Sequence, residues 1–226
     1  MTDSVQDPSL PPNHKPHYSK WGLIGLLAIV AILLYAWWVY VATDPAFGHY
    51  EGDVVTKWIS EDREMELVEP FVYVDPSGRR WTAGPGSVIN GASIPSAFWS
   101  VIGGPFEGRF RKASVLHDVA CEDQTEPWQD VHRMFYHACR CSRVGNGKAQ
   151  TMYWAVYNFG PRWSPAGTNV PMVFAAAPVD ESIVANAARY FERKDLSLED
   201  IEACTSAQIN QEVANWDATE ADSSSP

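Results

Sequence analysis

The fold is decided by two stretches, RFRKASVLHDVACE at residues 109–122 and WQDVHRMFYHACRCSR at residues 128–143. In each, apolar residues recur at helical spacing, which predicts two amphipathic helices. Because the connection between them is only about five residues long, the two helices should run antiparallel. The sequence therefore predicts a helical hairpin at the centre of the domain.

The flanking segments predict a mainly α member of the α+β class. Residues 65–74 and 79–83 read as two strands of a small β-hairpin, joined by the turn signal Asp75-Pro76-Ser77-Gly78. Further helices are expected at 148–159, 180–193 and 198–216.

A membrane anchor is predicted near the N-terminus. Residues 21–42, WGLIGLLAIVAILLYAWWVYVA, contain no charged residue. As a helix they would be about 33 Å long, enough to cross a bilayer core of roughly 30 Å. A cleaved signal peptide is the alternative, but its apolar region is shorter. Lys15 and Lys20 precede the helix, so the positive-inside rule places the N-terminus in the cytoplasm and the domain outside the inner membrane.

The predicted organisation has five parts. They are a disordered cytoplasmic stub at 1–20, a transmembrane helix at 21–42, a globular domain at 43–193 with its core at 60–160, a C-terminal helix at 194–218 and a disordered acidic tail at 219–226. The net charge of −11 argues against a nucleic-acid partner, because phosphate contacts need Lys and Arg. The membrane is the expected partner, and the sequence identifies no protein partner.

The hairpin brings candidate catalytic residues together. In an antiparallel hairpin that turns near residue 125, residues equally far from 125 on the two helices lie level with each other. This reflection places His117 and Asp118 beside His132, with Asp130 nearby. Two imidazoles with carboxylates can bind a metal or act as a general base. His137 points elsewhere and is expected at the surface.

Two other interpretations of these residues stay open. His117 shares the apolar face of its helix, so it can also be a buried structural histidine. A Ser-His-Asp triad using Ser93 or Ser96 is less favoured, because neither serine lies in a nucleophile-elbow motif.

The same reflection gathers cations at the open end of the hairpin. Three of them lie at a helix N-terminus, where the helix dipole disfavours positive charge, so an anionic partner such as lipid phosphate is one explanation. A solvated face paired with glutamates is the other. The cations are Arg109, Arg111, Lys112, Arg140 and Arg143.

The four cysteines do not form a metal motif, since Cys-x2-Cys spacing is absent. Reflection places Cys121 about 15 Å from Cys139, too far for a disulfide. Any bridge must therefore involve Cys204, and free thiols are equally compatible.

The order of motifs resembles the bacterial and phage family known as domain of unknown function 1353. The resemblance rests on PFVYV, NGASIPSAFW, IGGP, ASVLHDVACE and HRMFYHACRCSRV, within residues 60–160. It implies no established activity.

The His-Asp helix element also looks like the catalytic helix pair of secreted phospholipases A2. That likeness implies His117 as general base and Asp118 as a calcium ligand. Two positions depart from the pattern: Asn90 precedes Gly-Ala-Ser-Ile-Pro where Asp is usual, and His132 stands where the facing helix usually carries Asp. The phospholipase cysteine framework is also absent.

Two functions remain. One is a lipid or other ester hydrolase, active or degenerate, centred on His117 and Asp118. The other is a non-catalytic envelope or phage-derived interaction protein.

Overall fold

The computed structural model describes residues 20–42, 44–60, 63–91, 93–164, 173–174 and 179–223. The chain divides into two compact units at residue 41, and each is described by itself. The expected stub at 1–20 lies outside the described residues up to residue 19.

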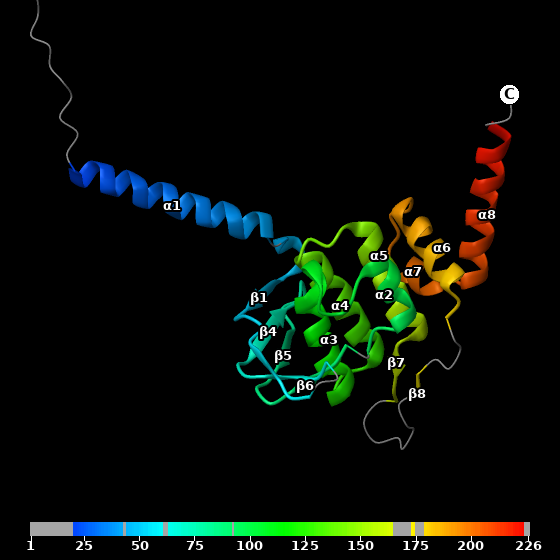
Figure 1. Cartoon of the computed structure of the whole chain (residues 1–226), viewed down its shortest axis with the longest axis horizontal. Coiled ribbons are helices and arrows are strands. Elements are labelled where there is room, and N and C mark those ends of the chain that lie inside the picture. The colour runs from blue at the N-terminus through cyan, green and yellow to red at the C-terminus, as the bar shows by residue number, and fades with distance from the viewer. Residues whose placement is uncertain are drawn as a thin grey trace, which may run out of the picture. The chain divides into compact units, whose positions relative to one another are not determined.

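The first unit contains helix α1, Lys20–Ala42 (Figure 1). Its described side chains are those of residues 22–35 and 37, and all of them are exposed. In the described part of the chain, no helix was found that has both the length and the apolarity needed to cross a membrane.

The second unit opens with a three-stranded antiparallel sheet. Its order is β1-β4-β5, formed by His49–Glu51, Phe71–Val74 and Arg80–Ala83. The predicted turn joins β4 to β5: the Asp75 carboxylate accepts hydrogen bonds from the backbone N–H groups of Ser77 and Arg79, and Gly78 takes φ +87°. The short 3-10 helix η1, Pro45–Phe47, precedes β1.

A second three-stranded sheet divides the expected long strand. Its order is β2-β3-β6, formed by Thr56–Trp58, Met65–Leu67 and Val88–Ile89. The prediction of one strand over 65–74 is wrong, because β3 ends at Leu67 and β4 begins after Pro70, which lacks a backbone N–H to continue a ladder. β3 and β4 therefore belong to different sheets.

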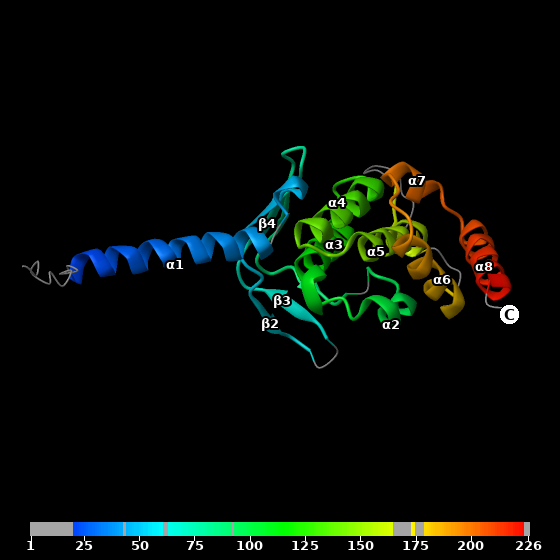
Figure 2. The same cartoon turned by 90° about the horizontal axis from the view of Figure 1, so that it is seen from above.

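The predicted helical hairpin is present. Helix α3, Arg111–Asp123, packs against α4, Trp128–Cys141, and α4 packs against α5, Asn146–Phe159. Figures 1 and 2 show these three helices side by side, between the sheets and the C-terminal helices. Before α3 come the 3-10 helices η2, Ser96–Phe98, and η3, Gly108–Phe110, and the short helix α2, Trp99–Ile102.

The C-terminal part differs from the expectation at its end. Helix α6, Glu181–Glu192, packs on α5, and the expected helix over 198–216 is two helices, α7, Leu198–Ala203, and α8, Ser206–Ser223. α8 continues through residues 219–223, which were expected to be disordered; residues 224–226 lie outside the described part. Strands β7, Pro161–Arg162, and β8, Val173–Phe174, pair with each other.

The hydrophobic core joins all these layers. Aromatic side chains from the first sheet and from the helices are fully buried together. The largest include Tyr73, Phe135, Tyr153, Trp154 and Phe191. The core therefore fixes the α3–α4 pair rigidly, and the candidate site lies between those two helices.

Candidate functional site: a buried histidine pair beside a cleft

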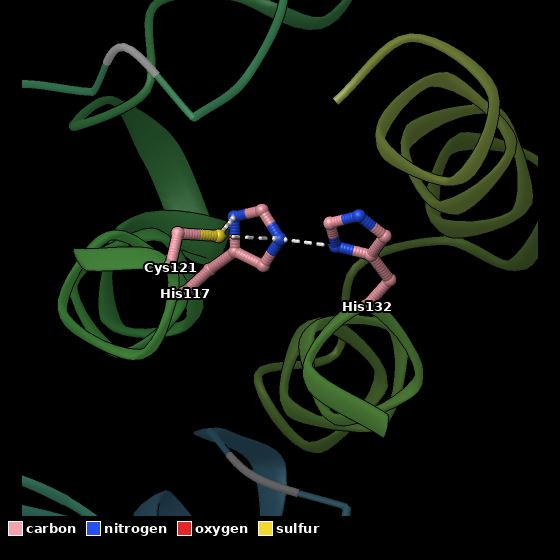
Figure 3. A group of neighbouring side chains, drawn as sticks. All are labelled: His117, Cys121 and His132. Atoms are coloured by element: carbon pink, nitrogen blue, oxygen red, sulfur yellow. Dashed lines mark hydrogen bonds between the residues drawn. The ribbon is translucent and has the colours of Figure 1, made fainter. Parts of the chain in front are cut away.

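The two histidines meet between α3 and α4. His117 lies on the buried face of α3, and His132 lies on the buried face of α4. Their rings point toward each other (Figure 3), and His117 Nε2 lies 2.8 Å from His132 Nδ1. The pairing expected from reflection of the two helices is therefore present in the structure.

Asp118 is held by the loop that precedes α2. Its Oδ2 accepts the backbone N–H groups of Asn90 at 3.1 Å and Gly91 at 2.5 Å, and its Oδ1 accepts the hydroxyl of Ser93. Gly91 has φ +76°, and a Cβ there would lie 2.2 Å from a carbon of Pro105, so the loop packs against Pro105 this closely only with glycine.

Ser93 connects Asp118 to the histidine pair. Its Oγ lies 3.0 Å from His117 Nδ1. At the other end of this series of hydrogen bonds, His132 Nε2 lies 3.1 Å from the carbonyl oxygen of Pro161. Because a carbonyl only accepts, His132 carries its proton on Nε2 and its Nδ1 accepts from His117 Nε2. Neutral His117 is therefore left with an unprotonated Nδ1 facing Ser93.

Burial keeps the two imidazoles uncharged. It lowers the pKa of His117 well below its usual value, with a further lowering by His132, and it lowers the pKa of His132 to about 3. Burial also raises the pKa of Asp118, against the hydrogen bonds that favour its ionised form. The ionised Asp118 accepts the Ser93 hydroxyl; when Asp118 is protonated this bond reverses, so that Asp118 donates to Ser93 and the Ser93 hydroxyl is free to donate to His117 Nδ1.

A cleft of about 610 Å³ borders one side of this hydrogen-bonded network. Asp118, Ser93, Asn90 and Cys121 line it, whereas His117 and His132 are not among the lining residues and have no exposed surface. A molecule in the cleft would therefore meet Ser93 first and the imidazole of His117 behind it.

Asp118 has no free carboxylate oxygen for the calcium-ligand role that was expected of it. Both carboxylate oxygens already accept hydrogen bonds from the loop and are buried. The described residues instead place three other possible ligands together, His117, Cys121 and His132, whose ligand atoms lie within 4.8 Å of one another.

Two neighbouring residues lie elsewhere than expected. Asp130 does not join the histidines; it forms an ion pair with Arg79 at 3.0 Å because it is on the outer face of α4. His137 is half-buried and not at the surface, since its ring packs against Phe47 and Tyr136.

The five cations have different surroundings. Lys112 pairs with Asp53 at 2.6 Å, and Arg140 lies over the ring of Phe47. Arg111 and Lys112 line a second cavity of about 520 Å³. Arg109 is exposed and Arg143 is half-buried with φ +55°, and neither of these two, nor Arg140, lines that cavity.

All four cysteines are free thiols. Cys121 and Ser93 are the two site residues that sequence reasoning undervalued. The motif Gly91-Ala92-Ser93-Ile94-Pro95 and the i, i+4 spacing of His117 and Cys121 were the available signals, since residues four apart share a helix face.

The fold and site define an α+β domain in which a glycine-turned loop and two antiparallel helices enclose a His-Ser-Asp network. Residues 65–156, from β3 into α5, match the family described as "Protein of unknown function (DUF1353)", and this segment is a domain of that family. The expected resemblance is therefore confirmed.

Two relatives from Sinorhizobium fredii carry similar segments. The uncharacterized protein y4jT is 43% identical over 120 residues, covering 52% of this chain and 36% of its own length. The uncharacterized protein y4iH is 38% identical over 97 residues, covering 43% of this chain and 41% of its own length. The chain thus matches well under half of the length of either relative. No solved structure matches it.

Proposed function

We propose that this chain is an ester hydrolase held at a membrane, with Ser93, His117 and Asp118 as its centre. The observation that carries the proposal is the placement of Ser93, whose Oγ lies 3.0 Å from His117 Nδ1 and borders the cleft. A hydroxyl and a base at this distance are a nucleophile and its activator.

In the proposed reaction, the Ser93 hydroxyl attacks the ester carbonyl from the cleft while its proton passes to His117 Nδ1. That proton then goes to the departing alkoxide, which leaves as an alcohol, and an acyl group stays on Ser93. A water molecule, deprotonated by the same nitrogen, releases the acid and restores the serine. His132 positions His117, because its bond to Pro161 fixes which ring nitrogen of His117 is free.

Asp118 acts through Ser93 and the loop. Its hydrogen bonds to Asn90 and Gly91 fix the position of the serine, and it supplies no charge to the cleft when protonated. Asp118 is thus proposed as a positioning residue, which differs from the calcium-ligand role expected from the likeness to phospholipases.

The membrane part of the proposal is supported by α1. Residues 21–42 carry no charge, and the large apolar side chains described in α1 are 43–67% exposed. Water contact over such a surface is costly, and bilayer hydrocarbon would remove that cost. We propose a single-pass anchor with the N-terminus in the cytoplasm and the domain in the periplasm. The exposed side chains of Arg109 and Arg111 would then be available to lipid phosphates.

The esterase test uses the full chain in detergent with p-nitrophenyl esters and with phosphatidylglycerol vesicles. We expect Ser93→Ala and His117→Gln to reduce hydrolysis by at least about 100-fold. Ser96→Ala is the matched control, because Ser96 is exposed three residues further on and should leave the rate unchanged. Equal rates in Ser93→Ala and the wild type would refute Ser93 as nucleophile.

The topology test is a reporter fusion. Alkaline phosphatase fused after residue 60 should be active in a Gram-negative host, because it folds only when exported. Activity confined to a matched cytoplasmic reporter would reverse the orientation. A mature chain beginning near Thr43 would mean that residues 21–42 are a signal peptide.

A non-catalytic role is the second candidate, and one observation favours it. His117 and His132 have no exposed surface, and their ring nitrogens all have hydrogen-bond partners, as braces between helices do. In that case the wild type hydrolyses neither substrate, and His117→Gln lowers the free energy of unfolding by about 1–3 kcal/mol, the cost of a poorly paired buried group.

A further inference from the structure

We infer that His117, Cys121 and His132 form a binding site for a divalent transition metal ion, with Zn²⁺ the best match. The ligand set is two imidazoles and one thiol, and these suit zinc, whereas calcium and magnesium prefer oxygen. The site lies between α3 and α4 and does not depend on the proposed hydrolase activity.

Two of the three ligand distances are near those of a tetrahedral centre, and all three ligand atoms lie within 4.8 Å of one another. Zinc bonds of about 2.0–2.1 Å to nitrogen and 2.3 Å to sulfur place a ligand nitrogen and sulfur about 3.6 Å apart, and two nitrogens about 3.3 Å apart. Cys121 Sγ lies 3.7 Å from His117 Nε2, which already fits. The two facing nitrogens lie 2.8 Å apart, so the rings need to separate by about half an ångström.

The ligands come from a rigid frame. His117 and Cys121 are one helical turn apart on α3, so they share a face, and His132 faces them from α4 (Figure 3). All three are at least 96% buried in the packed interface of the two helices. Little conformational entropy therefore remains to be lost when the ion binds.

The ring nitrogens that do not face the metal site form hydrogen bonds that orient both imidazoles for metal binding. A metal-binding histidine usually donates its other ring N–H to an oxygen, which directs the lone pair of the first nitrogen at the ion. His132 Nε2 faces the carbonyl oxygen of Pro161, and His117 Nδ1 faces the hydroxyl of Ser93, which in turn reaches Asp118. With these donors in place, two lone pairs point into the space between the rings.

Charge is balanced in the bound state. A divalent ion brings two positive charges, and the Cys121 thiolate and the Asp118 carboxylate bring two negative charges. A buried centre without net charge avoids the large desolvation cost of an unpaired ion. A carboxylate that is hydrogen-bonded to a ligating histidine, here through the hydroxyl of Ser93, strengthens metal binding by that histidine.

Metal binding and the proposed base chemistry exclude each other. The ion takes the lone pair of His117 Nε2, so the ring proton moves from Nε2 to Nδ1, and Nδ1 then cannot accept the proton of Ser93. Zinc is therefore expected to inhibit any esterase activity. Metal binding is measured without substrate, so it stands or fails independently of the hydrolase proposal.

The test uses the full chain in detergent after treatment with a chelator. Titration with Co²⁺ should give one equivalent of a complex with visible bands of tetrahedral cobalt, water being the fourth ligand, and a near-ultraviolet sulfur-to-cobalt band, both removed by Zn²⁺. Cys121→Ser should lose the sulfur band. Cys204→Ser is the matched control, since Cys204 lies between α7 and α8 away from the histidines, and it should keep the band. Zinc at 100 times its Kd should raise Tm by roughly 5–10 °C.

A measurement on the wild type keeps the inference testable if Cys121→Ser does not fold. X-ray absorption of the zinc-loaded protein should show one sulfur and two imidazole nitrogens in the first coordination shell. No cobalt spectrum, a sulfur band that persists in Cys121→Ser, or a coordination shell without sulfur would each overturn the site.

Discussion

Acid should destabilise this domain through His132, and the structure gives the size of the effect. Burial lowers the pKa of His132 from 6.5 to about 3 in the folded protein. A group with a lowered folded pKa contributes stability that is present above its unfolded pKa and is lost as the pH falls toward its folded pKa. For His132 the relevant window therefore runs from about pH 6.5 down to about pH 3.

The magnitude follows from 1.36 kcal/mol per pH unit for one proton. Between pH 7 and pH 5 the unfolded chain protonates this histidine and the folded chain does not, so the free energy of unfolding falls by about 2 kcal/mol. His117 adds in the same direction, because burial lowers its pKa as well. Asp118 acts oppositely, since a carboxyl with a raised pKa contributes stability that is lost as the pH rises.

One variant isolates the contribution of His132 to the change in the free energy of unfolding between pH 7 and pH 5. His132→Gln keeps a neutral donor for Pro161 and removes one titrating group, while His117 and Asp118 remain common to both proteins. Urea unfolding of the full chain in detergent, followed by tryptophan fluorescence at pH 7 and pH 5, gives the two changes. We expect the wild type to lose about 2 kcal/mol more than the variant. Equal losses would mean that His132 is not buried as a neutral ring, which would refute the site as described.

Three further predictions concern the loop, the tail and calcium. Gly91→Ala should lower Tm by several degrees and Gly78→Ala by less, because only at Gly91 does a Cβ collide with Pro105; both have positive φ, and equal shifts would contradict this explanation. Removal of residues 219–226 should leave Tm nearly unchanged in a thermal melt, because the described residues among them, 219–223, form the exposed end of α8; a drop of several degrees would show that this end packs on the domain. Calcium should not raise Tm in either the wild type or Asp118→Asn, since the carboxylate oxygens are already bonded; a calcium shift lost in Asp118→Asn would restore the calcium-ligand role.

The helical hairpin was predictable because its information is local. Apolar spacing marks α3 and α4, and a short connection leaves one arrangement, so His117 and His132 could be placed together from their numbers alone. The turn at 75–78 was predictable for the same reason, since Asp75 and Gly78 act within four residues.

The features that the sequence did not predict depend mainly on partners distant in sequence. β1 and β2 are three residues each, too short for a pattern, and they form only because β4 and β3 offer edges. Ser93 lies in no nucleophile-elbow motif, and its role comes from a loop that meets α3 across 24 residues of sequence. The helical end of α8 was missed because polar composition there indicates exposure and does not exclude a helix.

The hydrogen-bonded chain from Asp118 to Pro161 also bears on the lifetime of the folded state. Its members come from the loop before α2, from α3, from α4 and from the start of β7, so it is complete only when four segments have docked. We expect contacts that need such docking to form after the folding transition state, in which case their loss speeds unfolding more than it slows folding. We expect His117→Gln to raise the unfolding rate and leave the folding rate nearly unchanged. On this view the network slows unfolding and thereby sets how long the folded domain survives.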